Sequence, residues 1–114
     1  MPKRDPGLLI EDMLTAIQRV ERYTYGLDRT LFQEDEKTVD AVVRNLEILG
    51  EAARQMPEDF AARHPGIPWR QIAGLRNRIV HDYFGLDLDL IWQILQNDLP
   101  PLRALLEGTG AKPT

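Results

Sequence analysis

One pattern, over residues 39–56, does most to limit the folds open to this chain. Apolar residues recur there at spacings of three and four until Pro57: Val39, Val42, Val43, Leu46, Leu49, Ala53 and Met56. This period is typical of one face of an amphipathic α-helix. Gly50 lies inside the pattern, where glycine costs about 1 kcal/mol relative to alanine. We therefore expect another helix to approach Gly50 closely.

Similar spacings predict three more helices. The first starts at Asp5-Pro6 and runs to Gly26, the next starts at Pro68 and runs to Val80, and the last is capped by Asp87 and kinks or restarts at Pro100-Pro101. Short turns are expected over 28–32 and 58–63. No strand-like alternation is long enough to compete. The sequence thus predicts an all-α fold, an antiparallel bundle of four main helices with one short extra helix. Residues 1–108 are expected to form one domain and residues 109–114 a flexible tail.

Composition excludes several kinds of chemistry. The 114 residues include no cysteine and no serine, which removes disulfides, thiolates and serine nucleophiles. His64 and His81 are the two histidines, and no metal or phosphate-loop motif is present. No apolar run approaches the roughly 20 residues that cross a membrane, and Met1–Pro6 lacks an apolar leader. We expect a cytoplasmic protein without a cofactor.

Chemically capable groups concentrate in residues 75–85, which include Arg76, Asn77, Arg78, His81 and Tyr83. On an ideal helix, Arg76 and His81 would lie about 140° apart. They can point together only if the helix ends near Val80, as the following Gly85 and Asp87 indicate.

The charge distribution favours a phosphate-bearing partner near this stretch. Net charge is -4, but residues 60–81 contain four arginines and no acidic residue, which leaves -8 on the rest. A local basic patch on an acidic body can bind RNA phosphate and discourage promiscuous binding.

RNA cleavage without a metal needs a base, an acid and positive charge at the phosphate. His81 can transfer protons near neutral pH, and Arg76 can donate two parallel hydrogen bonds to a phosphate. Asn77 could orient the histidine or a phosphate oxygen, and Tyr83 could stack on a base. One histidine cannot serve both proton transfers unless two copies of the site face each other, so a homodimer is attractive.

Purely structural roles remain open for each of these residues. Arg76, four residues after Ile72, is expected near the inward edge of its helix, where Glu47 or Glu51 could pair with it inside the bundle. His81 could simply favour a helix C-terminus. The remaining groups also have ordinary roles: Tyr83 and Phe84 as core aromatics, Arg78 as a solvated charge, and His64 as a surface loop residue.

Four blocks together resemble the HEPN superfamily, and within it the HepT-type ribonuclease toxins. They are residues 72–84 (IAGLRNRIVHDYF), residues 46–53 (LEILGEAA), Pro68-Trp69 with its preceding loop, and residues 87–92 (DLDLIW).

The resemblance implies an all-helical homodimer that cleaves RNA without metal and is paired with a minimal nucleotidyltransferase as antitoxin. Arg76 and His81 match the family's catalytic pair, Asn77 its neighbouring polar residue, and Tyr83 the tyrosine that such antitoxins modify with AMP. Negative charge and bulk at Tyr83 would oppose RNA binding. A second hypothesis is a non-catalytic, nucleotide-binding or interaction module that partners a nucleotidyltransferase.

Overall fold

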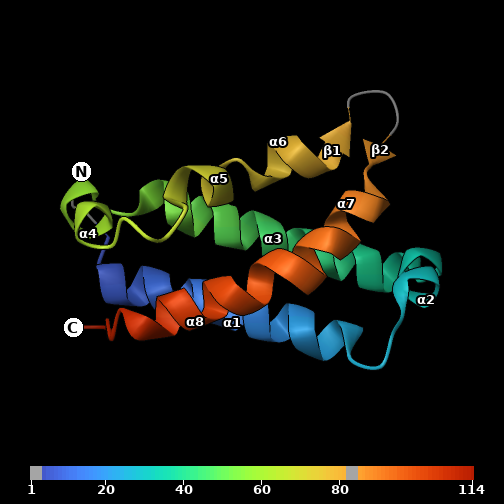
Figure 1. Ribbon diagram of the computed structural model, residues 1–114, viewed down its shortest axis with the longest axis horizontal. Coiled ribbons are helices and arrows are strands. Elements are labelled where there is room, and N and C mark those ends of the chain that lie inside the picture. The colour runs from blue at the N-terminus through green and yellow to red at the C-terminus, as the bar shows by residue number, and fades with distance from the viewer. Residues whose placement is uncertain (1–3, 82–84) are drawn as a thin grey trace.

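The computed structural model describes residues 4–81 and 85–114, and it is dominated by helices (Figure 1). In chain order the elements are α1 (Pro6–Thr24), α2 (Arg29–Glu34), α3 (Glu36–Gln55), α4 (Glu58–Arg63), α5 (Trp69–Ala73), α6 (Leu75–Ile79), β1 (Val80–His81), β2 (Gly85–Leu86), α7 (Leu88–Gln93), the π-helical turn η1 (Ile94–Asp98) and α8 (Leu99–Gly108). The segments α1, α3, α5–α6 and α7–η1–α8 run alternately in opposite directions. The predicted all-α antiparallel bundle is confirmed.

Aspartates begin four of the helices, three of them at predicted positions. Asp5, Asp28, Asp35 and Asp87 accept hydrogen bonds from the first-turn N–H groups of α1, α2, α3 and α7, at 2.8–3.1 Å. These N–H groups have no partner within their own helix, so each carboxylate satisfies one of them.

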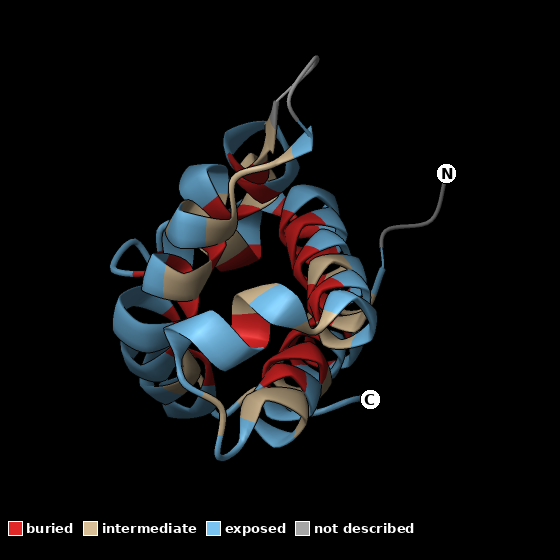
Figure 2. Cartoon of the chain, turned by 90° about the vertical axis from the view of Figure 1, so that its right-hand side faces the viewer, coloured by how far each residue is buried: buried red, intermediate tan, exposed pale blue. Residues whose placement is uncertain are grey.

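The core lies between α1, α3, α5–α6 and α7–η1–α8, whose buried faces turn inward in Figure 2. α3 meets α1 along much of its length and meets α5 near Gly50. A β-carbon at Gly50 would lie 3.0 Å from the carbonyl oxygen of Ile72. The predicted close approach at Gly50 is confirmed, and α5 is the helix that makes it.

The helix expected over residues 68–80 is divided at Gly74 into α5 and α6. The carbonyl of Ala73 accepts a hydrogen bond from Arg54 Nη2 at 3.1 Å, so a side chain of α3 binds a backbone group at the break. α6 ends at Ile79, and Val80 is extended. The predicted end of this helix near Val80 is therefore confirmed.

A two-residue antiparallel ladder, which the sequence did not predict, follows α6. Val80 pairs with Leu86 and His81 with Gly85. Gly85 has a φ of +75°, which glycine adopts without strain. The ladder is too short for an alternating apolar pattern to reveal it.

The last segment does not restart at the two prolines. It runs from α7 through η1 into α8, and the widened turn comes just before Pro100 and Pro101. Leu99 N–H donates to the carbonyl of Ile94, five residues back. Proline lacks an N–H and its ring crowds the preceding turn, so a wider turn at this place accommodates both rings.

Residues 109–114 run back to the start of α1. The N–H and the hydroxyl of Thr114 donate to Asp5 Oδ2 at 2.7 and 2.9 Å. That this tail is flexible stays a prediction. Within the described residues, no helix is long and apolar enough to cross a membrane.

Candidate active site

Two buried side chains orient α6. Leu75 and Ile79 lie one helical turn apart, are 4% and 0% exposed, and anchor the helix to the core. The three residues between them, Arg76, Asn77 and Arg78, are all exposed. These three polar residues therefore face solvent from a helix that is packed on the core.

Arg76 points towards α3. Its Nε lies 3.9 Å from Oε1 of Glu47, and its side chain is 72% exposed. The expectation that Arg76 sits at the inward edge of the helix is wrong, because Leu75 and Ile79 take the inward face. The pairing with Glu47 is confirmed as a surface contact rather than one inside the bundle. An exposed pair at this distance leaves the guanidinium free to donate to a phosphate.

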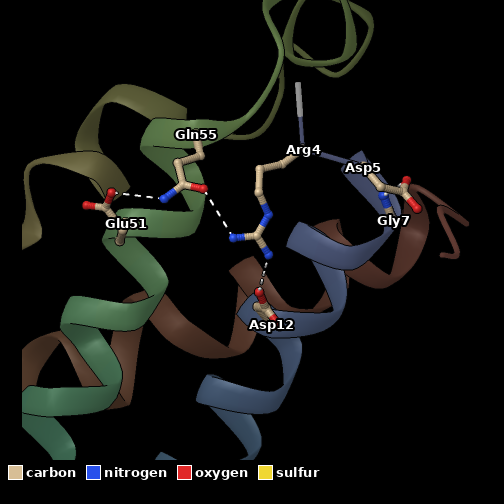
Figure 3. A network of polar contacts seen from close by, with 6 residues as sticks. All are labelled: Arg4, Asp5, Gly7, Asp12, Glu51 and Gln55. Carbon is tan, nitrogen blue, oxygen red and sulfur yellow. Dashed lines mark hydrogen bonds and ion pairs between the residues drawn. The ribbon is translucent and has the colours of Figure 1, made fainter. Parts of the chain in front are cut away.

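A groove of about 280 Å³ runs beside Arg76, between α3 and α5–α6, and we call it the α3 groove. Its charged residues are three arginines and two glutamates: Arg44, Arg54, Arg76, Glu47 and Glu51. Arg54 donates to Glu51 Oε2 at 2.9 Å. Figure 3 shows the other oxygen, Glu51 Oε1, which accepts from Gln55 at 3.0 Å. Sequence reasoning missed Arg44 and Arg54. The signal was available, because residues 44, 47, 51 and 54 form a charged stripe of helical spacing.

Arg78 lines a larger groove on another side of α6, formed with η1 and α8. The side chains of Asn77 and Arg78 have no hydrogen-bond or ion-pair partner within the described part of the chain. Both remain available to a ligand, so α6 presents guanidinium groups to two separate grooves.

The β1–β2 ladder that follows α6 includes one more residue of the motif, His81. The backbone of His81 lies in β1, and Asp87 N–H donates to the carbonyl of Ile79 at 2.8 Å, which ties the start of α7 to the end of α6. The imidazole of His81 and the whole of Tyr83 and Phe84 lie outside the described residues. Their roles therefore stay predictions.

His64 was expected on a surface loop. It follows α4, but it is half-buried, and its ring packs against Phe60 in a tilted arrangement with centroids 4.7 Å apart. Its carbonyl accepts from Trp69 Nε1 at 3.1 Å. His64 therefore helps to fix the loop before α5. Across residues 4–81 and 85–114 there is no group of three or more His, Asp or Glu side chains that could hold a metal ion.

Comparison with known proteins identifies the family. A family model described as "Ribonuclease HepT-like" matches residues 13–108, which span α6 and the hairpin. The chain belongs to the HepT-like ribonuclease family. The resemblance seen in the sequence is thereby confirmed.

The HepT-like relatives cover nearly the whole chain. A protein of Thermococcus cleftensis named "Probable ribonuclease HepT" is 40% identical, over 92% of this chain and 96% of its own length. "Putative RNase MJ0127" of Methanocaldococcus jannaschii is 38% identical, over 88% of this chain and 83% of its own length. "Putative RNase MJ1380" of the same organism is 37% identical, over 94% and 98%. No solved structure matches.

Proposed function

We propose that this HepT-like chain is a metal-independent endoribonuclease, and that it acts as the toxin of a toxin–antitoxin pair in the cytoplasm. The observation that carries the proposal is the exposed Arg76, in a short helix that ends at Ile79, two residues before His81. Membership of a ribonuclease family supplies RNA as the substrate class.

The chemistry is a transfer of the phosphate within RNA. A base removes the proton from a 2'-hydroxyl, the 2'-oxygen attacks the neighbouring phosphorus, and the bond to the 5'-oxygen breaks. An acid returns a proton to the 5'-oxygen, which leaves a cyclic phosphate and a 5'-hydroxyl. His81 transfers a proton, since imidazole titrates near pH 6.5. Arg76 stabilises the extra negative charge on the phosphate oxygens, and Asn77 orients one of the reacting groups.

A homodimer supplies the second proton-transfer group in this proposal. One imidazole cannot be base and acid in the same step, and two copies of the motif across a twofold axis would present two. No cofactor is required, since proton transfer and charge stabilisation complete the reaction.

Regulation is proposed to act on Tyr83. A cognate minimal nucleotidyltransferase would add AMP to its phenol, which places negative charge beside the RNA phosphate. A Tyr83→Phe variant co-expressed with that enzyme should carry no AMP by mass spectrometry, whereas the wild type should carry it. AMP remaining on Tyr83→Phe would place the modification elsewhere.

The test of the nuclease uses labelled single-stranded RNA and tRNA in EDTA. Wild type should cleave, and Arg76→Ala and His81→Ala should lose at least about a hundredfold in rate, as acid–base and charge-stabilising groups usually do. Arg19→Ala, on the exposed face of α1, and His64→Ala are matched controls that should retain activity once shown to be folded.

If wild type with unmodified Tyr83 cleaves no RNA beyond the Arg76→Ala and His81→Ala variants, the nuclease proposal is wrong. The second hypothesis, a non-catalytic module that binds a nucleotidyltransferase, would then be favoured. Its own check is co-purification of the two proteins.

A further inference from the structure

The bundle has an open seam. α5 and α6 pack on α3, and α8 packs on α1, but α5–α6 and η1–α8 do not pack closely on each other within the described residues. Between them lies a groove of about 570 Å³, which we call the seam groove. Its lining residues come mainly from the α5–α6 segment and from the η1–α8 segment, which is drawn below it in Figure 1. Pockets of a few hundred Å³ are the size that holds a small ligand or one nucleotide.

The seam groove combines an apolar floor with polar walls. Ile72, Leu75, Leu99 and Leu102 line its floor. Gln71 and Arg78 stand on one wall, and Asn97 and Asp98 on the other.

None of these four polar side chains has a hydrogen-bond or ion-pair partner among the described residues. In the α3 groove, by contrast, Arg54 and Arg76 are each paired with a glutamate. The seam groove therefore has exposed polar side chains, without partners among the described residues, around an apolar surface.

The π-helical turn supplies one of these walls. Asn97 and Asp98 belong to η1, whose widened turn precedes Pro100 and Pro101. Such turns recur at functional sites, because they change the direction of side chains in an otherwise regular helix. An amide and a carboxylate thereby line the same groove as Arg78.

These groups match one class of ligand. A nucleotide has a flat base with apolar faces, a polar base edge and a phosphate. Resting on the proposed ribonuclease function, we propose that the seam groove binds a guanine nucleotide of the RNA. Arg78, two residues after Arg76, binds its phosphate, and the base lies on the floor by Leu75 and Leu99.

Asp98 sets the choice of base. Guanine presents two neighbouring donors, N1–H and N2–H, that a carboxylate can accept together, and its O6 accepts from an amide such as that of Asn97. Adenine, cytosine and uracil have no such pair of adjacent donors on that edge, and adenine would set its N1 lone pair against the carboxylate. Guanine is therefore the base that this wall fits.

The first experiment measures binding of 5'-GMP, 5'-AMP, 5'-CMP and 5'-UMP to the full chain by calorimetry. Wild type should bind 5'-GMP most tightly. Asp98→Asn should weaken 5'-GMP binding by about tenfold or more, as loss of a bidentate base contact does, without changing the other three. Asp40→Asn, an exposed position on α3, is the matched control and should bind like wild type. Equal binding of the four nucleotides, or no effect of Asp98→Asn, would overturn the proposal.

The second experiment tests the guanine site and the nuclease activity separately, so that failure of one proposal can be told from failure of the other. Oligonucleotides carrying a single guanosine at successive positions should be cleaved at a fixed distance from it, and Asp98→Asn should raise KM for them.

Three outcomes are informative. If wild type cuts no RNA but binds 5'-GMP through Asp98, the nuclease proposal fails and the guanine site stands. If RNA is cut without a guanine preference and Asp98→Asn behaves as wild type, the guanine site fails and the nuclease stands. If Asp98→Asn changes the oligomeric state and not the nucleotide affinity, the groove is a protein interface and the proposal is wrong.

Discussion

Ile79 and Asn45 are both buried, but they affect stability in different ways. Ile79 is 0% exposed and holds α6 in place under the motif, whereas Asn45 is 5% exposed and polar. Asn45 Nδ2 donates to the carbonyl of Ala41 at 2.9 Å, but its Oδ1 has no partner among the described residues. A buried acceptor without a donor costs stability.

These two positions should respond differently to truncation. Ile79→Ala should lower the free energy of unfolding by about 2–5 kcal/mol, the usual cost of a buried aliphatic cavity. Asn45→Ala should change it by less than about 1 kcal/mol, because removing the unsatisfied acceptor offsets the lost packing. Urea unfolding measures both. An Asn45→Ala loss as large as that of Ile79→Ala would show that Oδ1 has a partner in solution.

Contacts with α2 hold α7 in place after the β1–β2 ladder. α2 meets α7 through the Phe32 and Trp92 rings, 5.4 Å apart, and through Asp89, which accepts from Gln33 Nε2 at 2.7 Å and Arg29 Nε at 3.1 Å. Hydrogen bonds from Gln33, and then from Arg29, lower the pKa of Asp89 below its ordinary 3.8.

This lowered pKa makes the α2–α7 contact sensitive to acid. Because the folded state favours the ionised carboxylate, the contribution of Asp89 is present above pH 3.8 and is lost as the pH falls through the lowered pKa. Asp89→Asn should therefore be less stable than wild type near pH 7, and the difference should shrink at low pH. Urea midpoints from about pH 7 to pH 2 measure it, with Asp40→Asn as control. A difference that is the same at every pH would rule out this linkage.

The contact between α3 and α5 depends on Gly50, which has no side chain. Gly50→Val should destabilise the fold by about 1–3 kcal/mol, because the β-carbon would press on the Ile72 carbonyl and push α5 from α3. Gly108→Val, where a β-carbon meets nothing within 4 Å, should cost much less. Equal losses for the two variants in thermal unfolding would show that α5 moves aside freely.

The first described residues, Arg4 and Asp5, lie at the same end of the molecule as Thr114. Arg4 reaches from the start of the chain to Asp12 on α1 at 3.4 Å and to Gln55 on α3 at 3.3 Å (Figure 3). A hydrogen bond joins Gln55 to Glu51, so this network extends to the α3 groove beside Arg76. The C-terminal residues, which we call the closing residues, lie over Gly7. A β-carbon at Gly7 would be 2.0 Å from the carbonyl oxygen of Lys112.

Gly7→Ala should therefore release the closing residues from α1. The hydrogen bonds from Thr114 to Asp5 would then be lost, and carboxypeptidase should trim residues 111–114 faster than in wild type. Gly66→Ala, in open space, is the matched control. Equal trimming of Gly7→Ala and wild type would favour the flexible tail expected from the sequence.

The parts of the site that could be predicted are those that depend on neighbours along the chain. The end of α6 near Val80 followed from Gly85 and Asp87, and the approach at Gly50 followed from a glycine inside a strong helical pattern. The α3 groove was missed because Arg44 and Arg54 lie more than 20 residues from Arg76 and meet it only when α3 packs on α5–α6. The reading of Arg76 as inward-facing failed because four-residue spacing from Ile72 ignores the break at Gly74.

Local chemistry was enough to predict the helices and three of the four aspartate caps, because helical period and capping act over a few residues. The sequence also shows Arg76, Asn77, Arg78 and His81 close together along the chain. Only the tertiary structure decided which groove each arginine lines and that Asn97 and Asp98 of η1 line the same groove as Arg78. Those relations depend on how closely helices pack and where a backbone widens, and both follow from contacts between residues distant in the sequence.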